Sequence, residues 1–238
     1  MPWIQILAPV FLAAPAVLPL QEQVASTPEE PIKLAPLELK ALADEIGEMA
    51  RLDQLHRSAV QWGTTDPAEL ARLDALDDDA TMAEWIRRNR EGIELPKEVR
   101  DELMVKQNVL DKANVIRLGE IIRAHGYPDP KRLGVDFPSV APILIHAQLE
   151  DYWLIQPQLL VEVKAGRMNP KAYAATYDRK LQHAGKIQLY GTGLAIDVKT
   201  GKKLPPLIED IEVTNRARKE IGLEPLGNHR TPPHSGDK

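Results

Sequence analysis

The sequence predicts a mainly α-helical protein with a small β-hairpin near its C-terminal end, an α+β fold. Apolar residues recur at helical spacing, between N-cap and stop signals, from residue 37 to about residue 183. After Gly185 the spacing changes, and apolar residues alternate at every second position, as in a strand with one buried face. These two observations predict the fold class, and the 238 residues allow one large domain.

Three helices are expected in the first half of the domain. The first covers residues 37–60, where apolar side chains form a stripe. The second begins at Asp66 and Pro67, an N-cap followed by proline at the first helical position, and runs to about residue 90. Its acidic run, residues 77–79, is expected to be a solvated face or a break. The third helix spans residues 96–125 and ends at glycine and proline stop signals.

The second half continues with shorter elements. Helical patterns cover residues 139–156 and 159–165, and Asn169 with Pro170 begins a further helix that reaches about residue 183. The hairpin is expected after Gly185, where Ile187, Leu189, Leu194, Ile196 and Val198 alternate, with a turn at residues 199–202. A last short helix is expected over residues 213–221.

The first 26 residues are predicted to be a signal peptide. Residues 1–21 carry no charged side chain, and small residues follow the apolar stretch, although an uncharged n-region is atypical. We therefore expect an exported protein, periplasmic or secreted, with no membrane attachment after cleavage; a misassigned start codon or an uncleaved anchor are the alternatives. Residues 27–36 are expected to be a linker, 37–226 a single helical domain and 227–238 a disordered tail.

Composition excludes several classes of function. The net charge is −5 with both signs interspersed, and only two Phe and five Tyr are present, so a nucleic-acid partner is not expected. The absence of cysteine excludes thiol nucleophiles and thiolate metal sites. The histidines show no metal-ligand spacing, and no phosphate loop or nucleophile elbow occurs. We expect neither a metal nor a cofactor.

Polar residues lie on the apolar faces of two predicted helices. Asp53 and Arg57, four residues apart, fall inside the apolar stripe of the first helix. Gln107, Asp111 and Asn114 fall inside the apolar arc of the third. Because burying unpaired polar groups costs a few kcal/mol each, these residues predict a polar cluster between the helices. The cluster would be either an internal network that sets helix register or the floor of a pocket.

The same positions carry a resemblance to a family. From residue 49 to residue 226 the chain resembles the uncharacterised DUF family 6624. The matching residues are Asp53-Gln54, Arg57, Asp111, Asn114, Arg117-Leu118, Ile121-Ile122, Gly126-Tyr127-Pro128, Gly134, His146-Ala147, Gln156, Asp178-Arg179, Gly185 to Thr192, Ile208-Glu209-Asp210, Arg218 and Gly222-Leu223. The resemblance implies a shared fold and a shared site but no particular reaction. Two departures are Ile145 and Gln148 on either side of His146-Ala147, where the family motif reads Gln-His-Ala-Asp, and Gly193 in place of a frequent Gln.

Three residues are the candidate catalytic groups. His146 is the best candidate for acid–base work, because histidine is the side chain suited to proton transfer near neutral pH, although a lone core histidine bonded to a carbonyl is the structural alternative. Asp178 and Arg179 are adjacent on a helix, so their side chains point about 100° apart and need separate partners. Arg179 could hold a carboxylate or phosphate in its fork.

A ligand-binding set completes the candidate site. It joins the polar helix residues to the hairpin and consists of Asp53, Arg57, Asp111, Asn114, Gln188, Tyr190 and Thr192. The main hypothesis is an exported binding module for a small molecule or an envelope component. The alternative is a hydrolase or lyase in which His146 and Asp178 transfer protons and Arg179 holds an anionic group. A third possibility is that the polar cluster only specifies the fold.

Overall fold

The computed structural model describes residues 34–193, 195–196, 203–204 and 206–227. Within them the chain is built from helices joined by short loops. The elements are α1 Pro36–Gln54, α2 Arg57–Trp62, α3 Pro67–Asp74, α4 Asp78–Glu91, α5 Lys97–His125, α6 Pro130–Leu133, α7 Ala141–His146, α8 Leu149–Lys164, α9 Pro170–His183, β1 Ala195–Ile196, β2 Lys203–Leu204 and α10 Ile211–Glu220.

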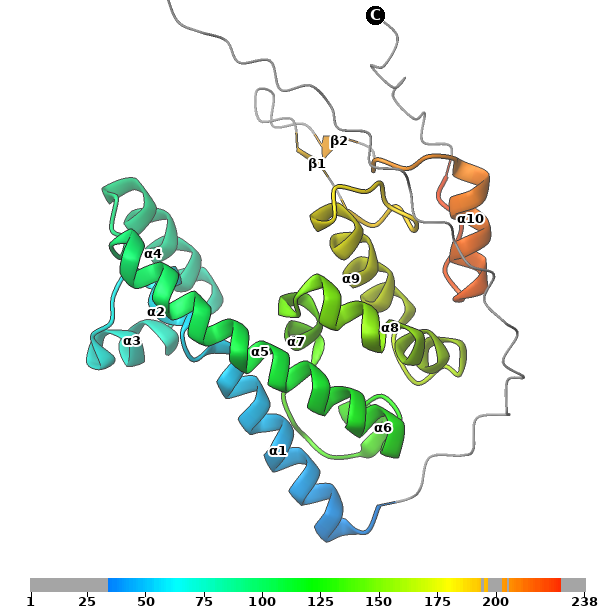
Figure 1. Cartoon of the computed structure of the whole chain (residues 1–238), viewed down its shortest axis with the longest axis horizontal. Helices are drawn as coiled ribbons and strands as arrows, with labels where there is room; N and C mark the ends of the chain where they lie inside the picture. The colour runs from blue at the N-terminus through cyan, green and yellow to red at the C-terminus, as the bar shows by residue number, and fades with distance from the viewer. Residues whose placement is uncertain (1–33, 194, 197–202, 205, 228–238) are drawn as a thin grey trace, which may run out of the picture. The chain divides into compact units, whose positions relative to one another are not determined.

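The long helix α5 organises the core. It packs against α1, α2, α7 and α8, and α9 packs in turn against α7 and α8 (Figure 1). The core between these helices is filled by Ile46, Leu118, Ile121, Leu144 and Leu159, all almost fully buried. Each such aliphatic side chain contributes about 1.5–3 kcal/mol when it leaves water. Burial along α1, α5 and α8 therefore holds α7 in place, and α7 carries His146.

Two predicted helices are each divided in the structure. The predicted helix 37–60 becomes α1 and α2, separated at Leu55 and His56. The predicted helix 66–90 becomes α3 and α4, and the division falls at the acidic run, where the Asp77 carboxylate accepts the backbone N–H of Ala80. Of the two expectations for that run, the break is confirmed. The predicted cap at Asp66 is also confirmed, because its carboxylate accepts the N–H of Ala68.

A third boundary was placed wrongly by the sequence. The pattern predicts one helix over residues 139–156 and a new one after Pro157, but Pro157 lies inside α8. The chain breaks instead at Ala147 and Gln148, which are extended and separate α7 from α8. A proline destabilises the interior of a helix because it has no N–H to donate and because its ring clashes with the preceding turn. The apolar burial of α8 outweighs that loss.

The α+β fold class is wrong. The described part of the chain is helical apart from β1 and β2, which pair over two residues each: Ala195 with Leu204 and Ile196 with Lys203. The first predicted strand is absent, since residues 186–190 make a single bridge, Gln188 to Ile208, instead of a ladder. The predicted turn at 199–202 lies outside the described residues. Alternating apolar residues here mark a loop with buried contacts, which is bonded by Asp178 of α9 and by Arg218 of α10.

The remaining helices agree with the sequence. α5 and α9 have their predicted bounds to within a residue, and the predicted last helix corresponds to α10, which begins two residues earlier than expected. The signal peptide, most of the linker and nearly all of the tail lie outside the described residues. No helix in the described part of the chain has the length and apolar character needed to cross a membrane.

Candidate functional site

An ion-paired cluster lies where α1 gives way to α2. Arg57 holds Asp111 of α5 through two bonds, Nη1 to Oδ1 at 2.8 Å and Nη2 to Oδ2 at 2.5 Å. The same guanidinium donates to the backbone carbonyl of Asp53 at 2.5 Å and lies 3.7 Å from its carboxylate. Bidentate pairing of this kind fixes both the position and the orientation of the two charges. The contact between Asp53 and Arg57, which their four-residue spacing predicted, is confirmed.

The polar residues on the inner face of α5 cap the broken end of α1. The last turn of a helix leaves carbonyl groups without an intrahelical partner. The amide of Asn114 donates to the Met49 carbonyl at 3.0 Å, and that of Gln107 donates to the Leu52 carbonyl at 3.0 Å. Gln107 also accepts the N–H of His56 at 2.9 Å. Gln107 is therefore buried because the break between α1 and α2 needs partners, whereas Asn114 bonds α1 about one turn before that break.

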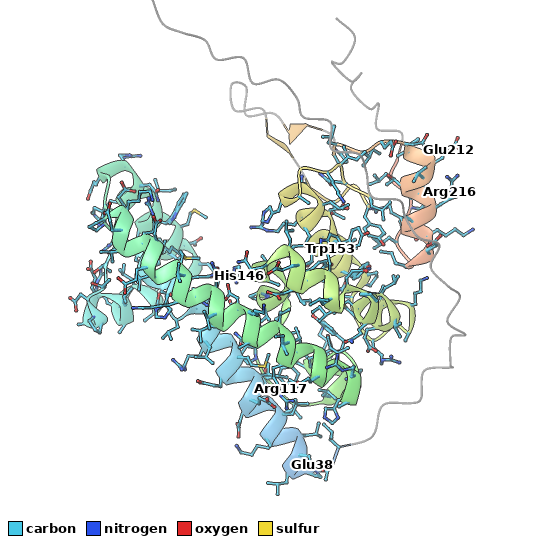
Figure 2. The ribbon with its side chains drawn as sticks, viewed as in Figure 1. Glu38, Arg117, His146, Trp153, Glu212 and Arg216 are labelled. Carbon is cyan, nitrogen blue, oxygen red and sulfur yellow. The ribbon has the colours of Figure 1, made fainter. Side chains whose placement is uncertain are left out.

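His146 joins this cluster through Asp53. Its Nδ1 lies 3.0 and 2.9 Å from the two oxygens of the Asp53 carboxylate. Because a carboxylate only accepts, this geometry places a proton on Nδ1, and in the neutral ring the lone pair is then on Nε2. The Asp53 side chain is 2% exposed and that of His146 is 27% exposed. Figure 2 shows His146 at the end of α7, on the side where that helix meets α5.

Lys180 is a site residue that sequence reasoning missed. Its side chain is buried, and Nζ donates to the carbonyls of Ile145, at 2.9 Å, and of Ala147, the two residues that flank His146. The pKa of Lys180 is lowered to about 8, chiefly by burial and then by the positive charge of Arg179, while Asp111 acts in the opposite direction. The available signal was spacing: Lys180 lies seven residues after the buried Tyr173, on the same face of α9.

Asp178 organises a loop and makes no contact with His146. One carboxylate oxygen accepts the N–H groups of Leu189 and Tyr190, each at 2.9 Å. The other accepts the N–H of Thr192 at 2.9 Å and its hydroxyl at 2.8 Å. Asp178 is fully buried. Four donors on one carboxylate hold the loop over α9, so the geometry gives Asp178 a structural role and pairs His146 with Asp53.

The remaining predicted residues take separate places. Gln188 is buried and bonds another residue of the same loop: its side-chain amide donates to the Gly193 carbonyl and accepts the Gly193 N–H. Tyr190 is buried among aromatic rings, 5.9 Å from Tyr173 between centroids. Arg179 is exposed on α9, and as predicted it points away from Asp178. The polar strand face expected at Gln188 and Tyr190 is therefore interior.

The structure thus divides the predicted site residues into two groups. Asp53, Arg57, Asp111 and His146 form one network of side-chain bonds, and Asn114 bonds the same helix as Asp53 at the Met49 carbonyl. Asp178, Gln188, Tyr190 and Thr192 build the loop beside Arg179. Over the described ranges no three acidic or histidine side chains are grouped to hold a metal ion. The chemistry that this arrangement can perform is proton transfer at one oriented imidazole.

Comparisons with protein-family models, with curated proteins and with solved structures found no match for this chain. The resemblance to DUF family 6624 therefore stays a prediction. The assignment of a function depends on the geometry of the site.

Proposed function

We propose that the protein is an acid–base enzyme, a hydrolase or lyase, in which His146 transfers protons and Asp53 orients it. The observation that carries the proposal is the 2.9 Å contact between Nδ1 of His146, a side chain that is 27% exposed, and the buried carboxylate of Asp53. A neutral imidazole held in this tautomer is a general base near neutral pH. The sequence hypothesis made Asp178 a second proton-transfer group beside His146; in this proposal the carboxylate beside His146 is Asp53, and it orients the ring.

The proposed step is the same for both reaction types. Nε2 accepts a proton from a water molecule or from the substrate as the new bond forms or the carbon–hydrogen bond breaks. The imidazolium, stabilised by Asp53, then returns that proton to the leaving group. The network of Arg57, Asp111, Gln107 and Asn114 holds Asp53 on α1, so the dyad has the rigid support that acid–base geometry requires.

The first experiment tests the tautomer. Two-bond ¹H–¹⁵N spectra of the protein labelled at histidine are expected to show His146 protonated at Nδ1, and Asp53→Asn is expected to abolish that preference. Protonation of the neutral ring at Nε2 in the unaltered protein would refute the proposal.

The second experiment tests activity. Hydrolysis of p-nitrophenyl esters and phosphates is measured for the unaltered protein, His146→Gln and Asp53→Asn. We expect both variants to lose about 10²–10⁴-fold of any activity found, because each removes the oriented base. His125→Gln is the matched control, since His125 lies at the end of α5 and does not contact Asp53. Equal activity in His146→Gln and the unaltered protein would exclude the dyad as the catalytic centre.

Binding without catalysis is a second proposal, supported by a different feature. A cleft beside Arg179 and Thr192 is lined by two residues of the predicted set. The predicted export of the protein would place either activity outside the cytoplasm, with a small molecule or an envelope component as its target.

A further inference from the structure

A cleft separate from the dyad lies between α7, α9 and the loop that Asp178 holds. Its volume is about 400 Å³, which is within the range of small-molecule sites. Ile145 contributes from α7, Ala172, Ala175 and Arg179 from α9, and Thr192 and Gly193 from the loop.

The polar groups in the wall are largely used within the protein. The hydroxyl of Thr192 donates to Asp178, and that of Thr176 donates to the Ala172 carbonyl. The N–H and the carbonyl of Gly193 both bond Gln188. The Ile145 carbonyl accepts from Lys180. A ligand in this cleft therefore meets mainly methyl and methylene groups, and a polar ligand body would lose its hydrogen bonds to water without replacement.

The Gln182 amide also lines the cleft and makes no side-chain bond to the described residues, but the charged exception is Arg179. It is the charged residue of the lining, no carboxylate lines the cleft, and Arg179 forms no ion pair with any acid of the described residues. Its guanidinium presents N–H donors in a fork that matches a carboxylate. The neighbouring Lys180 lies on the same helix, close enough for the charge of Arg179 to lower the pKa of Lys180.

The wall is also preorganised. Asp178 holds Leu189, Tyr190 and Thr192 through four bonds, and Gln188 closes the end of the loop at Gly193. Binding to such a wall orders few additional groups, so little of the interaction energy is lost to entropy.

We propose that this cleft binds a small monocarboxylic acid with an apolar body. The carboxylate lies on the Arg179 fork, and the hydrocarbon part packs on Ile145, Ala172 and Ala175. This inference does not depend on the acid–base role of His146, whose Nδ1 and Asp53 take no part in the lining.

The test uses octanoate as the probe, with the full chain, by isothermal titration calorimetry and by ¹H–¹⁵N shift mapping. We expect saturable binding, with shifts at Thr192 and Gly193. Arg179→Gln is expected to weaken octanoate by at least about tenfold, the effect of losing a charged hydrogen bond. Octanol, which has the same chain without the charge, is expected to bind the unaltered protein more weakly by a similar factor.

Two further variants separate recognition from general effects. Ala175→Leu fills the cleft at an exposed helical position, where leucine is well tolerated, and is expected to abolish binding without unfolding the protein. Arg216→Gln removes an exposed arginine on α10, outside this cleft, and is expected to leave binding unchanged (Figure 2). Absence of saturable octanoate binding, equal affinity for octanol, or equal loss in Arg216→Gln would each overturn the proposal.

Discussion

Arg57 forms a bidentate ion pair with Asp111 through both of its terminal nitrogens, although the two residues lie 54 positions apart in the chain. The pair joins the start of α2 to the middle of α5 and is largely buried: the Asp111 side chain is 1% exposed and that of Arg57 16%. Asp53 depends on it, because the same guanidinium holds the Asp53 carbonyl. The ion pair is therefore the support on which the dyad rests.

Arg57→Met is expected to lower the free energy of unfolding by about 3–5 kcal/mol, since it leaves the Asp111 carboxylate buried without a partner. Urea unfolding followed by circular dichroism measures the loss. The double variant Arg57→Met with Asp111→Leu removes both charges and is expected to recover most of it. If the double variant were as unstable as the sum of the two single ones, the two residues would not be coupled.

Asp178→Asn is expected to loosen the loop above α9. The substitution turns one acceptor oxygen into a donor that faces N–H or O–H groups, so two of four bonds are lost, at a cost of about 2–4 kcal/mol. Amide hydrogen exchange at Leu189, Tyr190 and Thr192 is expected to accelerate strongly. Thr192→Val, which removes the hydroxyl alone, should have a much smaller effect; equal effects would contradict the assigned role of Asp178.

Lys180 predicts a specific dependence of stability on pH. Its pKa is lowered from 10.5 to about 8 in the folded protein, chiefly by burial. Between these two values the unfolded chain binds more protons than the folded one, so the contribution of Lys180 to the free energy of unfolding rises as pH increases from about 8 towards 10. A neutral amine keeps two N–H groups for the carbonyls of Ile145 and Ala147.

Urea titrations between about pH 7 and pH 9.5 compare the unaltered protein with Lys180→Met. The variant is expected to be less stable at every pH, because two carbonyls lose their donor. Its free energy of unfolding is not expected to rise between about pH 8 and pH 9.5. This window lies below the titration of Tyr127 and Tyr173, whose pKa values burial raises to about 12. Parallel pH profiles for the two proteins would show that Lys180 does not titrate in this range.

Tyr152 and Tyr173 form a matched pair of buried tyrosines with opposite expectations. The Tyr152 hydroxyl has no hydrogen-bond partner among the described residues, whereas that of Tyr173 accepts from the Gln156 amide at 2.5 Å. Tyr152→Phe is expected to leave the free energy of unfolding unchanged or to raise it by up to about 1 kcal/mol. Tyr173→Phe is expected to lower it by about 1–2 kcal/mol, because Gln156 loses its acceptor. Thermal unfolding of both variants gives the comparison, and a larger loss in Tyr152→Phe would contradict it.

Much of the helical order was predictable because its signals are local. Caps such as Asp66, and the glycine after His125, act within one turn of the chain, and α5 and α9 begin and end where these signals lie. The polar residues on the inner face of α5 also predicted a buried cluster. The predicted hairpin is wrong because an alternating pattern indicates only that one face of a segment is buried. The hydrogen-bond partners of residues 188–192 include a carboxylate and other side chains instead of a paired second strand.

By itself the sequence determined the helical class, the caps, the presence of a polar cluster and the candidacy of His146. Which acid pairs with His146 was decided by tertiary structure, because Asp53 and Asp178 are equally plausible until α7 is packed against α1 and α9. The same packing decided that Lys180 is buried and that Arg179 is not. The physical reason is range: capping and periodicity act over a few residues, whereas desolvation and charge pairing depend on neighbours that are tens of residues away and are set only by the packed core.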